Sequence, residues 1–245
     1  MKIKIEFHYT YIIMLLGFTL TGSFKNAIIL TSIILIHELG HYLVAQLLKI
    51  NVSKIIIYPY GGITKINDKI NLNINKELLV ALAGVTFQSI YYYLIIVLNK
   101  FTPNTLEMFK LYHYSILYFN LLPIYPLDGA KIINLIFSKF IPFKLSNALT
   151  VFLSVIIIII LGATNIYKLN YSYIMIISIL LYDLYKFWLE LEYIYNKFLL
   201  ERYLYNINYK KLEIVQRKED MYKNKRHIIG RKTEHDVLTK TFDNK

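Results

Sequence analysis

Two histidines and a glutamate at helical spacing are the residues of this sequence best suited to chemistry. His37, Glu38 and His41 form an H-E-x-x-H pattern. Residues four apart share one face of a helix, so both imidazoles can bind a single metal ion. Glu38 is placed to take a proton from metal-bound water rather than to bind the metal. Zinc suits imidazole and needs no redox chemistry, so we predict one Zn²⁺ ion as cofactor.

A third protein ligand is expected at Asp128, because a catalytic zinc site combines three protein ligands with one open position. The segment from Asn120 to Gly129 reads Asn-Leu-Leu-Pro-Ile-Tyr-Pro-Leu-Asp-Gly. Its two prolines break a helix, and broken backbone at membrane depth is tolerated only inside protein or beside a watery cavity. Taken alone, Asp128 is better explained as the cap of the next helix. Beside an H-E-x-x-H motif, the ligand interpretation is favoured.

The composition indicates a membrane protein. Of 245 residues, 56% are hydrophobic, and the mean hydropathy is +0.43. Soluble chains are about 45–50% apolar even with glycine included. The chain has no cysteine, which excludes disulfides, thiolate metal sites and cysteine nucleophiles. The net charge of +12 comes from lysines in loops and in the C-terminal tail, so we predict no nucleic-acid partner.

Six apolar segments approach the length of about 20 helical residues that crosses a bilayer. We therefore predict an all-α polytopic membrane protein with about six transmembrane helices, at residues 8–22, 27–48, 77–98, 108–127, 148–163 and 171–189. The H-E-x-x-H motif falls within the second. An ionisable group at the bilayer centre costs about 2.5–3.5 kcal/mol, which a bound metal would offset. The other interpretation, a solvated helix end, conflicts with the apolar residues on both sides.

The domain organisation and orientation follow from the same pattern. Residues 1–190 are predicted to form a membrane-embedded metalloprotease domain and 191–245 a cytosolic basic tail. Lysines of the short loops gather on the side that holds both termini, which predicts cytoplasmic termini. Residues 216–245 are charged and are expected to be loosely ordered.

Between the second and third segments, residues 50–76 do not have a helical pattern. A β-prone run is followed by a turn at Gly61 and Gly62 and then by a second short run. This pattern predicts a hairpin or a re-entrant loop. Bare strand edges cannot face lipid, so the loop must lie at the membrane surface or against protein.

The remaining ionisable residues are given structural explanations. His113 is interpreted as an interfacial or hydrogen-bonded histidine, and Asp183 as the partner of Lys186 three residues on. His227 and His235, in the tail, are expected to be solvated.

The two motifs resemble those of the site-2 protease family of intramembrane zinc metalloproteases. They stand in the family's order and on separate spans. Within the family the sequence is most similar to the stage IV sporulation protein FB type, which has six spans, no PDZ domain between its motifs and a cytosolic C-terminal part. That type releases sigma-K from its membrane-associated pro-form, pro-sigma-K, in sporulation. The resemblance implies a mother-cell membrane around the forespore, inhibitory membrane partners and possible homo-oligomers.

The resemblance also implies roles for individual residues. His37, His41 and Asp128 would bind zinc, and Glu38 would activate water. Asn120 would position substrate or stabilise the oxyanion. Gly61 and Gly62 match a re-entrant loop that would present substrate as an extended strand. The chain departs from the family pattern at Ala130, where glycine is usual, at Val85, where proline is usual, and at Gln88, which stands near an asparagine position.

Three alternatives remain open. A protease of this type could act on another substrate, such as an anti-sigma factor or a signal-peptide remnant. A metal transporter could use the same residue types, although it would be expected to show repeated halves and polar residues on several spans. An inactive membrane scaffold would not need two intact motifs.

Overall fold

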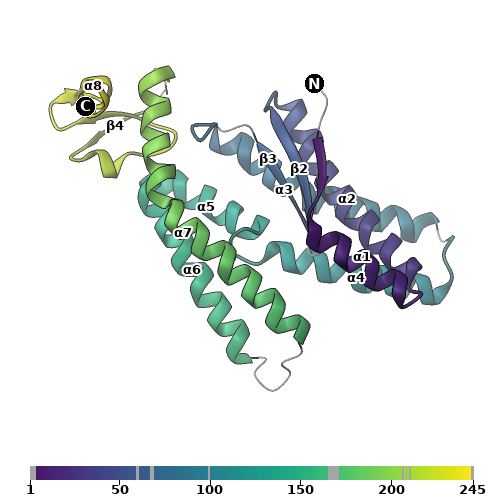
Figure 1. Ribbon diagram of the computed structural model, residues 1–245. Coiled ribbons are helices and arrows are strands. Elements are labelled where there is room, and N and C mark those ends of the chain that lie inside the picture. The colour runs from purple at the N-terminus through teal and green to yellow at the C-terminus, as the bar shows by residue number, and fades with distance from the viewer. Residues whose placement is uncertain are drawn as a thin grey trace. The chain divides into compact units, whose positions relative to one another are not determined.

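The computed structural model describes residues 4–58, 61–66, 69–98, 100–164, 171–205, 207, 209 and 211–243. The chain forms two compact units. The first contains residues 1–68 and 78–121, and the second contains residues 69–77 and 122–245. Helices make up most of the described chain, and short strands accompany them in each unit (Figure 1).

The first unit combines four helices with a small sheet. Its elements are β1 (Lys4–Phe7), α1 (Tyr9–Leu20), α2 (Phe24–Leu47), β2 (Val52–Tyr58), β3 (Gly61–Ile66), most of α3 (Ile74–Leu98) and α4 (Pro103–Leu121). Strand β2 is central, parallel to β1 and antiparallel to β3. The predicted hairpin is therefore confirmed as the β2–β3 pair, although Gly61 and Gly62, predicted in its turn, are the first two residues of β3. Helix α2 packs against α1, α4, β2 and β3, so its side chains are enclosed by the rest of the unit.

Helix α2 ends sharply before the hairpin. Lys49 adopts a left-handed backbone with φ of 57°, and the amide of Ile50 donates to the carbonyl of Ala45 over 2.8 Å. This is the bonding of a Schellman motif, which satisfies carbonyls at the end of a helix. The chain is thereby turned back, so that β2 and β3 run along the helix that carries the H-E-x-x-H motif.

Three of the six predicted spans are confirmed as long and apolar enough to cross a membrane. Among the described residues these are α2, α3 and α6 (Phe143–Thr164). Helix α1 has 12 residues, and at about 1.5 Å per residue it is too short to cross the hydrocarbon layer alone. Helix α4 ends at Leu121, before the prolines, so the fourth predicted span does not reach 127. The sheets also show that the all-α description is incomplete.

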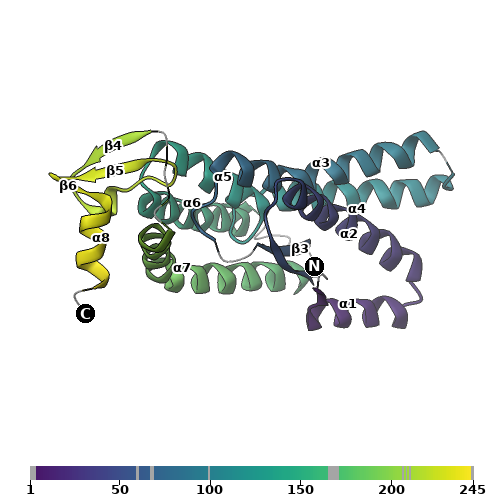
Figure 2. The same ribbon diagram turned by 90° about the horizontal axis from the view of Figure 1, so that it is seen from above.

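The second unit begins with three helices and ends in a folded C-terminal segment. The helices are α5 (Asp128–Phe140), α6 and α7 (Tyr171–Tyr205), and α6 and α7 lie side by side in both ribbon views (Figure 2). The C-terminal elements are β4 (Leu212–Val215), the 3₁₀ helix η2 (Lys218–Asp220), β5 (Arg226–Ile229), β6 (Lys232–Thr233) and α8 (Glu234–Phe242). Strand β5 is central, parallel to β4 and antiparallel to β6.

The prediction of a loosely ordered C-terminal segment is wrong. Val215, Met221, Ile229 and Leu238 form a buried core with Phe198 and other residues near the end of α7. Helix α8 starts with a capping box, in which Thr233 and Asp236 satisfy each other's backbone amides. The apolar residues are too widely spaced to give a periodic signal, and the charged residues between them dominate the composition.

Two buried charges at the end of α7 bind this segment together. Arg202 pairs with Glu234 over 2.7 Å and donates to the carbonyls of Tyr222, Lys223 and Lys225. Glu201 accepts from the backbone amides of Ile70 and Asn71. The end of α7 therefore holds both the chain before α3 and the loops of the C-terminal segment.

Candidate metal centre and active site

Helix α2 presents His37 and His41 together, as their spacing predicts. Both side chains are buried, with exposed fractions of 2% and 4%. Their Nε2 atoms lie 3.1 Å apart. Two imidazole nitrogens at this separation inside an apolar helix can share one cation.

Helix α3 orients one of these imidazoles through its backbone. The Nδ1 atom of His41 lies 2.7 Å from the carbonyl oxygen of Val80. A carbonyl oxygen can only accept, so Nδ1 carries the proton and donates it. The Nε2 atom of His41 therefore keeps its lone pair for a metal ion.

The other imidazole is oriented by Gln88. Its Oε1 lies 2.9 Å from Nδ1 of His37, and its Nε2 donates to the backbone carbonyl of His113 over 2.9 Å. Because that carbonyl requires the amide NH₂ group, Oε1 must face His37 and accept its proton. Gln88 is wholly buried. Hydrogen-bonded partners of this kind fix the tautomer and ring orientation of metal-binding histidines.

A glycine leaves the space in front of both rings. A Cβ atom placed on Gly84 would lie 2.6 Å from Nε2 of His37 and would also collide with Nε2 of His41. Val80, Gly84 and Gln88 follow one another at intervals of four, so one face of α3 supplies both orienting acceptors and the open space. This spacing is visible in the sequence, but its meaning depends on knowing that α3 faces α2.

Glu38 lies against the start of β3, the second strand of the hairpin. Its exposed fraction is 2%. A Cβ atom on Gly62 would collide with Cγ and Cδ of Glu38 and lie 2.7 Å from its Oε1. The adjacent Gly61 approaches Asn120, since a Cβ atom there would lie 3.3 Å from the amide Oδ1. The structure thus brings together Glu38, Asn120 and both predicted glycines.

Asp128 is the first residue of α5, and Leu127 occupies the cap position. Asp128 is half-buried. It belongs to the second unit, whereas His37 and His41 belong to the first, so its role as the third ligand stays a prediction. Two imidazoles and one carboxylate are a ligand set known from catalytic zinc sites.

Comparisons with known proteins agree with this chemistry. The model of peptidase family M50 matches residues 25–110, which contain the H-E-x-x-H motif. The stage IV sporulation protein FB of Bacillus subtilis (strain 168) is 34% identical over 208 residues, covering 82% of this chain and 72% of that protein. This chain belongs to the M50 family of site-2 proteases. It is therefore an integral-membrane zinc metalloendopeptidase.

Two further relatives come from Methanocaldococcus jannaschii. A zinc metalloprotease of that organism is 31% identical over 152 residues, covering 57% of this M50 chain and 44% of the relative. The solved site-2 protease of that organism matches with a TM-score of 0.60 at 24% identity, covering 74% of this chain and 89% of that one. The structural match shows that the two proteins share a fold.

The histidines of this M50 protease fit zinc in distance as well as in chemistry. Zinc–nitrogen bonds of about 2.05 Å at tetrahedral angles would place the two nitrogens about 3.3 Å apart. The observed separation is 3.1 Å. Both nitrogens are the unprotonated ones, and Gly84 leaves space before them.

Three further histidines of this M50 protease make contacts away from His37 and His41. His113 is buried, its carbonyl binds Gln88, and its ring stacks on Tyr92 with centroids 4.2 Å apart. The expectation that His227 is solvated is wrong, because it is 1% exposed and hydrogen-bonded to Glu234 and to the amide of Tyr222. His235 is exposed and stacks against Tyr203.

Proposed function

We propose that this protease cuts a membrane-associated substrate of the pro-sigma-K kind, with zinc held by His37, His41 and Asp128 and with Glu38 as general base. The observation that carries the proposal is the pair of buried, pre-oriented imidazoles on α2, next to Glu38. When bound there, zinc would lower the pKa of water and polarise the scissile carbonyl.

Glu38 moves the proton in this proposal. Its carboxylate takes a proton from the attacking water and then gives it to the leaving amine. The close approach of Gly62 limits the room around the carboxylate, so its contact with bulk water is restricted. A larger residue at position 62 would displace Glu38 from the path of the proton.

Asn120 and the start of β3 are proposed to position the substrate. The Nδ2 atom of Asn120 donates to the carbonyl of Ile116 over 3.1 Å, which holds the amide in one orientation. Its Oδ1 faces Gly61. An extended substrate segment exposes the peptide carbonyl that a helix would hide in hydrogen bonds. A strand edge beside Glu38 suits such a segment.

The topology is also part of the proposal. We propose six spans with both termini in the cytoplasm, and a boundary near residue 190 between a membrane-embedded catalytic region and a cytosolic C-terminal segment. The length and hydropathy of α2, α3 and α6 support three of these spans. The other three spans are proposed from the apolar segments of the sequence, and the orientation is proposed from the loop lysines. The mother-cell membrane around the forespore is the proposed location.

The substrate assignment rests on the relative from Bacillus subtilis, whose name places it in sporulation. Two proteins that are 34% identical are expected to share their catalytic chemistry more often than their substrate. Inhibitory membrane partners and homo-oligomers are expected by the same analogy. An anti-sigma factor or a signal-peptide remnant would use the same catalytic residues.

The test is a co-expression assay in bacterial membranes. The wild-type protein, Glu38→Gln and the control Glu190→Gln are each produced with the N-terminal part of a pro-sigma-K substrate. Glu190 is an exposed residue of α7, so its substitution changes charge equally without touching the site. Cleavage is followed as a size shift on a blot, and the zinc content of each purified protein is measured.

We expect wild type and Glu190→Gln to cleave, and Glu38→Gln to bind zinc without cleaving. Cleavage by the Glu38→Gln protein would show that Glu38 is not the general base. If wild type binds zinc but leaves this substrate intact while cutting an anti-sigma factor or a signal-peptide remnant, the pro-sigma-K assignment is wrong and the catalytic one stands.

A further inference from the structure

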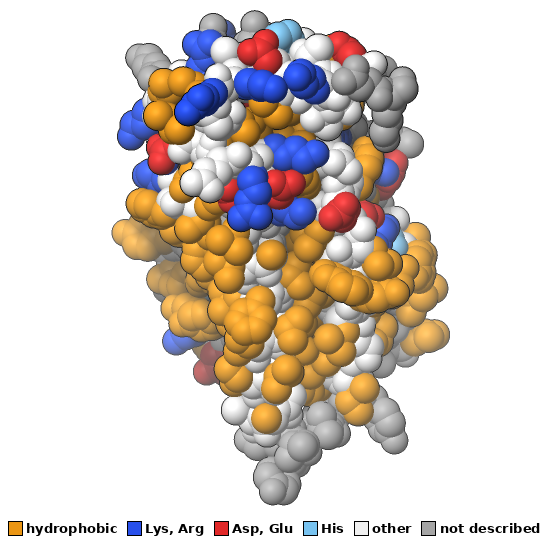
Figure 3. All heavy atoms as spheres, turned by 90° about the vertical axis from the view of Figure 1, so that its left-hand side faces the viewer, with side chains coloured by type: hydrophobic (Ala, Val, Ile, Leu, Met, Phe, Trp, Pro, Cys, Tyr) orange, Lys and Arg blue, Asp and Glu red, His pale blue; other side chains and the backbone are white. Residues whose placement is uncertain are grey.

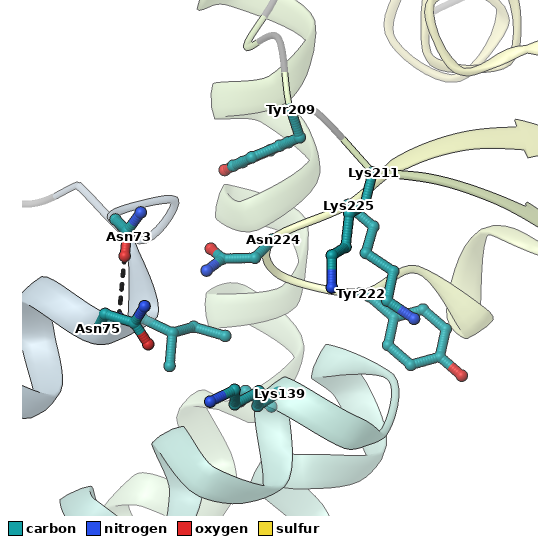
Figure 4. A pocket seen from close by; sticks show the side chains of 10 residues that line it. Asn73, Asn75, Lys139, Tyr209, Lys211, Tyr222, Asn224 and Lys225 are labelled. Carbon is teal, nitrogen blue, oxygen red and sulfur yellow. Dashed lines mark hydrogen bonds between the residues drawn. The ribbon is translucent and has the colours of Figure 1, made fainter.

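The second unit contains a cavity of about 550 Å³ that the catalytic chemistry does not use. Side chains from the start of α3, the end of α5 and the loops flanking β4 and β5 line it (Figure 4). The lining residues that matter here are polar or basic: Asn75, Lys139, Tyr209, Lys211, Asn224 and Lys225. None of the described residues that line the cavity is acidic.

Two of its lysines have no carboxylate partner among the residues that the structure describes. Lys225 pairs with Glu213 over 3.0 Å and lies over the ring of Tyr222. Within the part of the chain that the structure describes, no carboxylate pairs with Lys139 or Lys211, and both residues are exposed. The cavity therefore has a positive potential that an anion would neutralise.

Asn224 offers the cavity a buried acceptor. Its Oδ1 atom is buried and has no hydrogen-bond partner among the described residues. Figure 4 shows its amide pointing into the space near the Tyr209 hydroxyl and Asn75. Buried carbonyl oxygens are almost always hydrogen-bonded in proteins. Rotation of the amide toward the cavity would expose this oxygen to a ligand hydroxyl or N–H group, which would then satisfy it.

The cavity lies where two membrane helices begin. Lys223 pairs with Glu77, in the first turn of α3, over 2.6 Å. The amide of Phe143, the first residue of α6, donates to the carbonyl of Met221 over 2.9 Å. Both α3 and α6 are apolar enough to span a membrane. The loop 221–224 therefore marks the level at which two spans start, and that loop lines the cavity.

The molecular surface is divided into a charged and an apolar region. On the face drawn in Figure 3, charged side chains gather above and hydrophobic side chains cover the area below. A band of charge directly above an apolar surface is typical of the layer where lipid headgroups lie.

We propose that this cavity binds a phosphate ester that carries a hydroxyl group, supplied by the headgroup of an anionic lipid such as phosphatidylglycerol. The phosphate oxygens would accept from Lys139 and Lys211, and a glycerol hydroxyl would donate to Oδ1 of Asn224. The hydroxyl of Tyr209 already donates to the carbonyl of Asn71, so it is available as a further acceptor. A soluble phosphate ester presents the same chemistry, and the test separates the two sources.

The test counts bound lipids on the full-length protein. Purified protein in a non-ionic detergent is mixed with phosphatidylglycerol or phosphatidylcholine, and bound lipid is measured by native mass spectrometry. A parallel arm measures thermal stabilisation by sodium phosphate. The variants are Lys139→Ala/Lys211→Ala and Asn224→Asp, which is nearly isosteric and places a negative charge against the phosphate. Arg231→Ala/Lys240→Ala removes the same charge from exposed positions outside the cavity.

We expect wild type and the control to prefer phosphatidylglycerol. Each cavity variant should weaken that binding about tenfold or more, given the contribution of a lysine near an anionic surface. Stabilisation by sodium phosphate that the variants lose would identify a soluble ester as the source. Equal binding of the two lipids by wild type, or unchanged binding by both folded variants, would overturn the proposal. If one variant fails to fold, the other decides.

Discussion

Replacing Gly84 with alanine tests the geometry of the metal centre most directly. The new methyl carbon would lie 2.6 Å from Nε2 of His37 and would collide with Nε2 of His41. Non-bonded carbon contacts are optimal at about 3.5 Å or more. The imidazoles or α3 would therefore have to move by about 1 Å. The same substitution favours the helix itself by about 1 kcal/mol, because alanine has a higher helix propensity than glycine.

The displacement sets the size of the expected effect. Disturbing the partners that orient metal ligands lowers metal affinity by about 10–100-fold. A misplacement of about 1 Å can reduce catalysis by about 10²-fold. We therefore expect Gly84→Ala to lose zinc affinity and nearly all cleavage. In the metal-free protein, the helix propensity of alanine should offset part of the cost of moving the imidazoles or α3, so the loss of thermal stability should be small.

Gly162→Ala is the matched control. Gly162 lies in α6, and a Cβ atom placed there meets no atom of the described residues within 4 Å. Zinc affinity is measured by competition with a chelator, and stability by thermal unfolding of the metal-free protein in detergent. Wild-type zinc affinity in Gly84→Ala would refute the reasoning that α3 encloses the metal. Equal loss of zinc in Gly162→Ala would show that the effect is not local.

Three further predictions follow from the hydrogen-bond networks. Gln88→Leu removes the acceptor for Nδ1 of His37, so zinc affinity should fall about 10–100-fold in chelator competition; unchanged affinity would contradict the orienting role. Arg202→Leu leaves Glu234 buried without its cation, so the free energy of unfolding should fall by about 3–5 kcal/mol. The exposed control Arg217→Leu should show no such loss. Burial lowers the pKa of His227, so the unfolded chain takes up the proton more readily and stability should fall as the pH drops below about 6.5. A His227→Gln protein with the same pH dependence between pH 7 and 5 would show that another group is responsible.

The catalytic helix could be predicted because its signal is local. His37, Glu38 and His41 lie within one and a half turns, so their spacing alone determines which side chains share a face. The hairpin itself could also be predicted, because two β-prone runs follow each other closely. The predicted turn at Gly61 and Gly62 is wrong, since both glycines belong to β3 and pair with Tyr58 and Ile57. The approach of Gly62 to Glu38 could not be predicted from the sequence, because it depends on how the hairpin packs along α2.

The C-terminal segment shows the opposite case. Its core residues Val215, Met221, Ile229 and Leu238 are separated by six to nine positions that are rich in lysine and acidic side chains. No helical or strand period connects them. The burial of Arg202 and His227 is equally hidden. The partners of Arg202 lie 20 or more positions away, and His227 is satisfied by Glu234 and by the backbone amide of Tyr222. Composition alone predicts disorder for such a sequence, although a small core is present.

Gln88 shows how a departure from a family pattern can be explained by contacts. From the sequence it is only an amide near the position of an expected asparagine. In the structure its two ends have different partners: Nε2 binds the carbonyl of His113 on α4, and Oε1 receives the proton of His37 on α2. The amide cannot rotate without losing both bonds, so α4 orients a metal ligand on α2 through α3. Substitutions at His113 that keep its backbone should therefore affect zinc affinity much less than substitutions at Gln88.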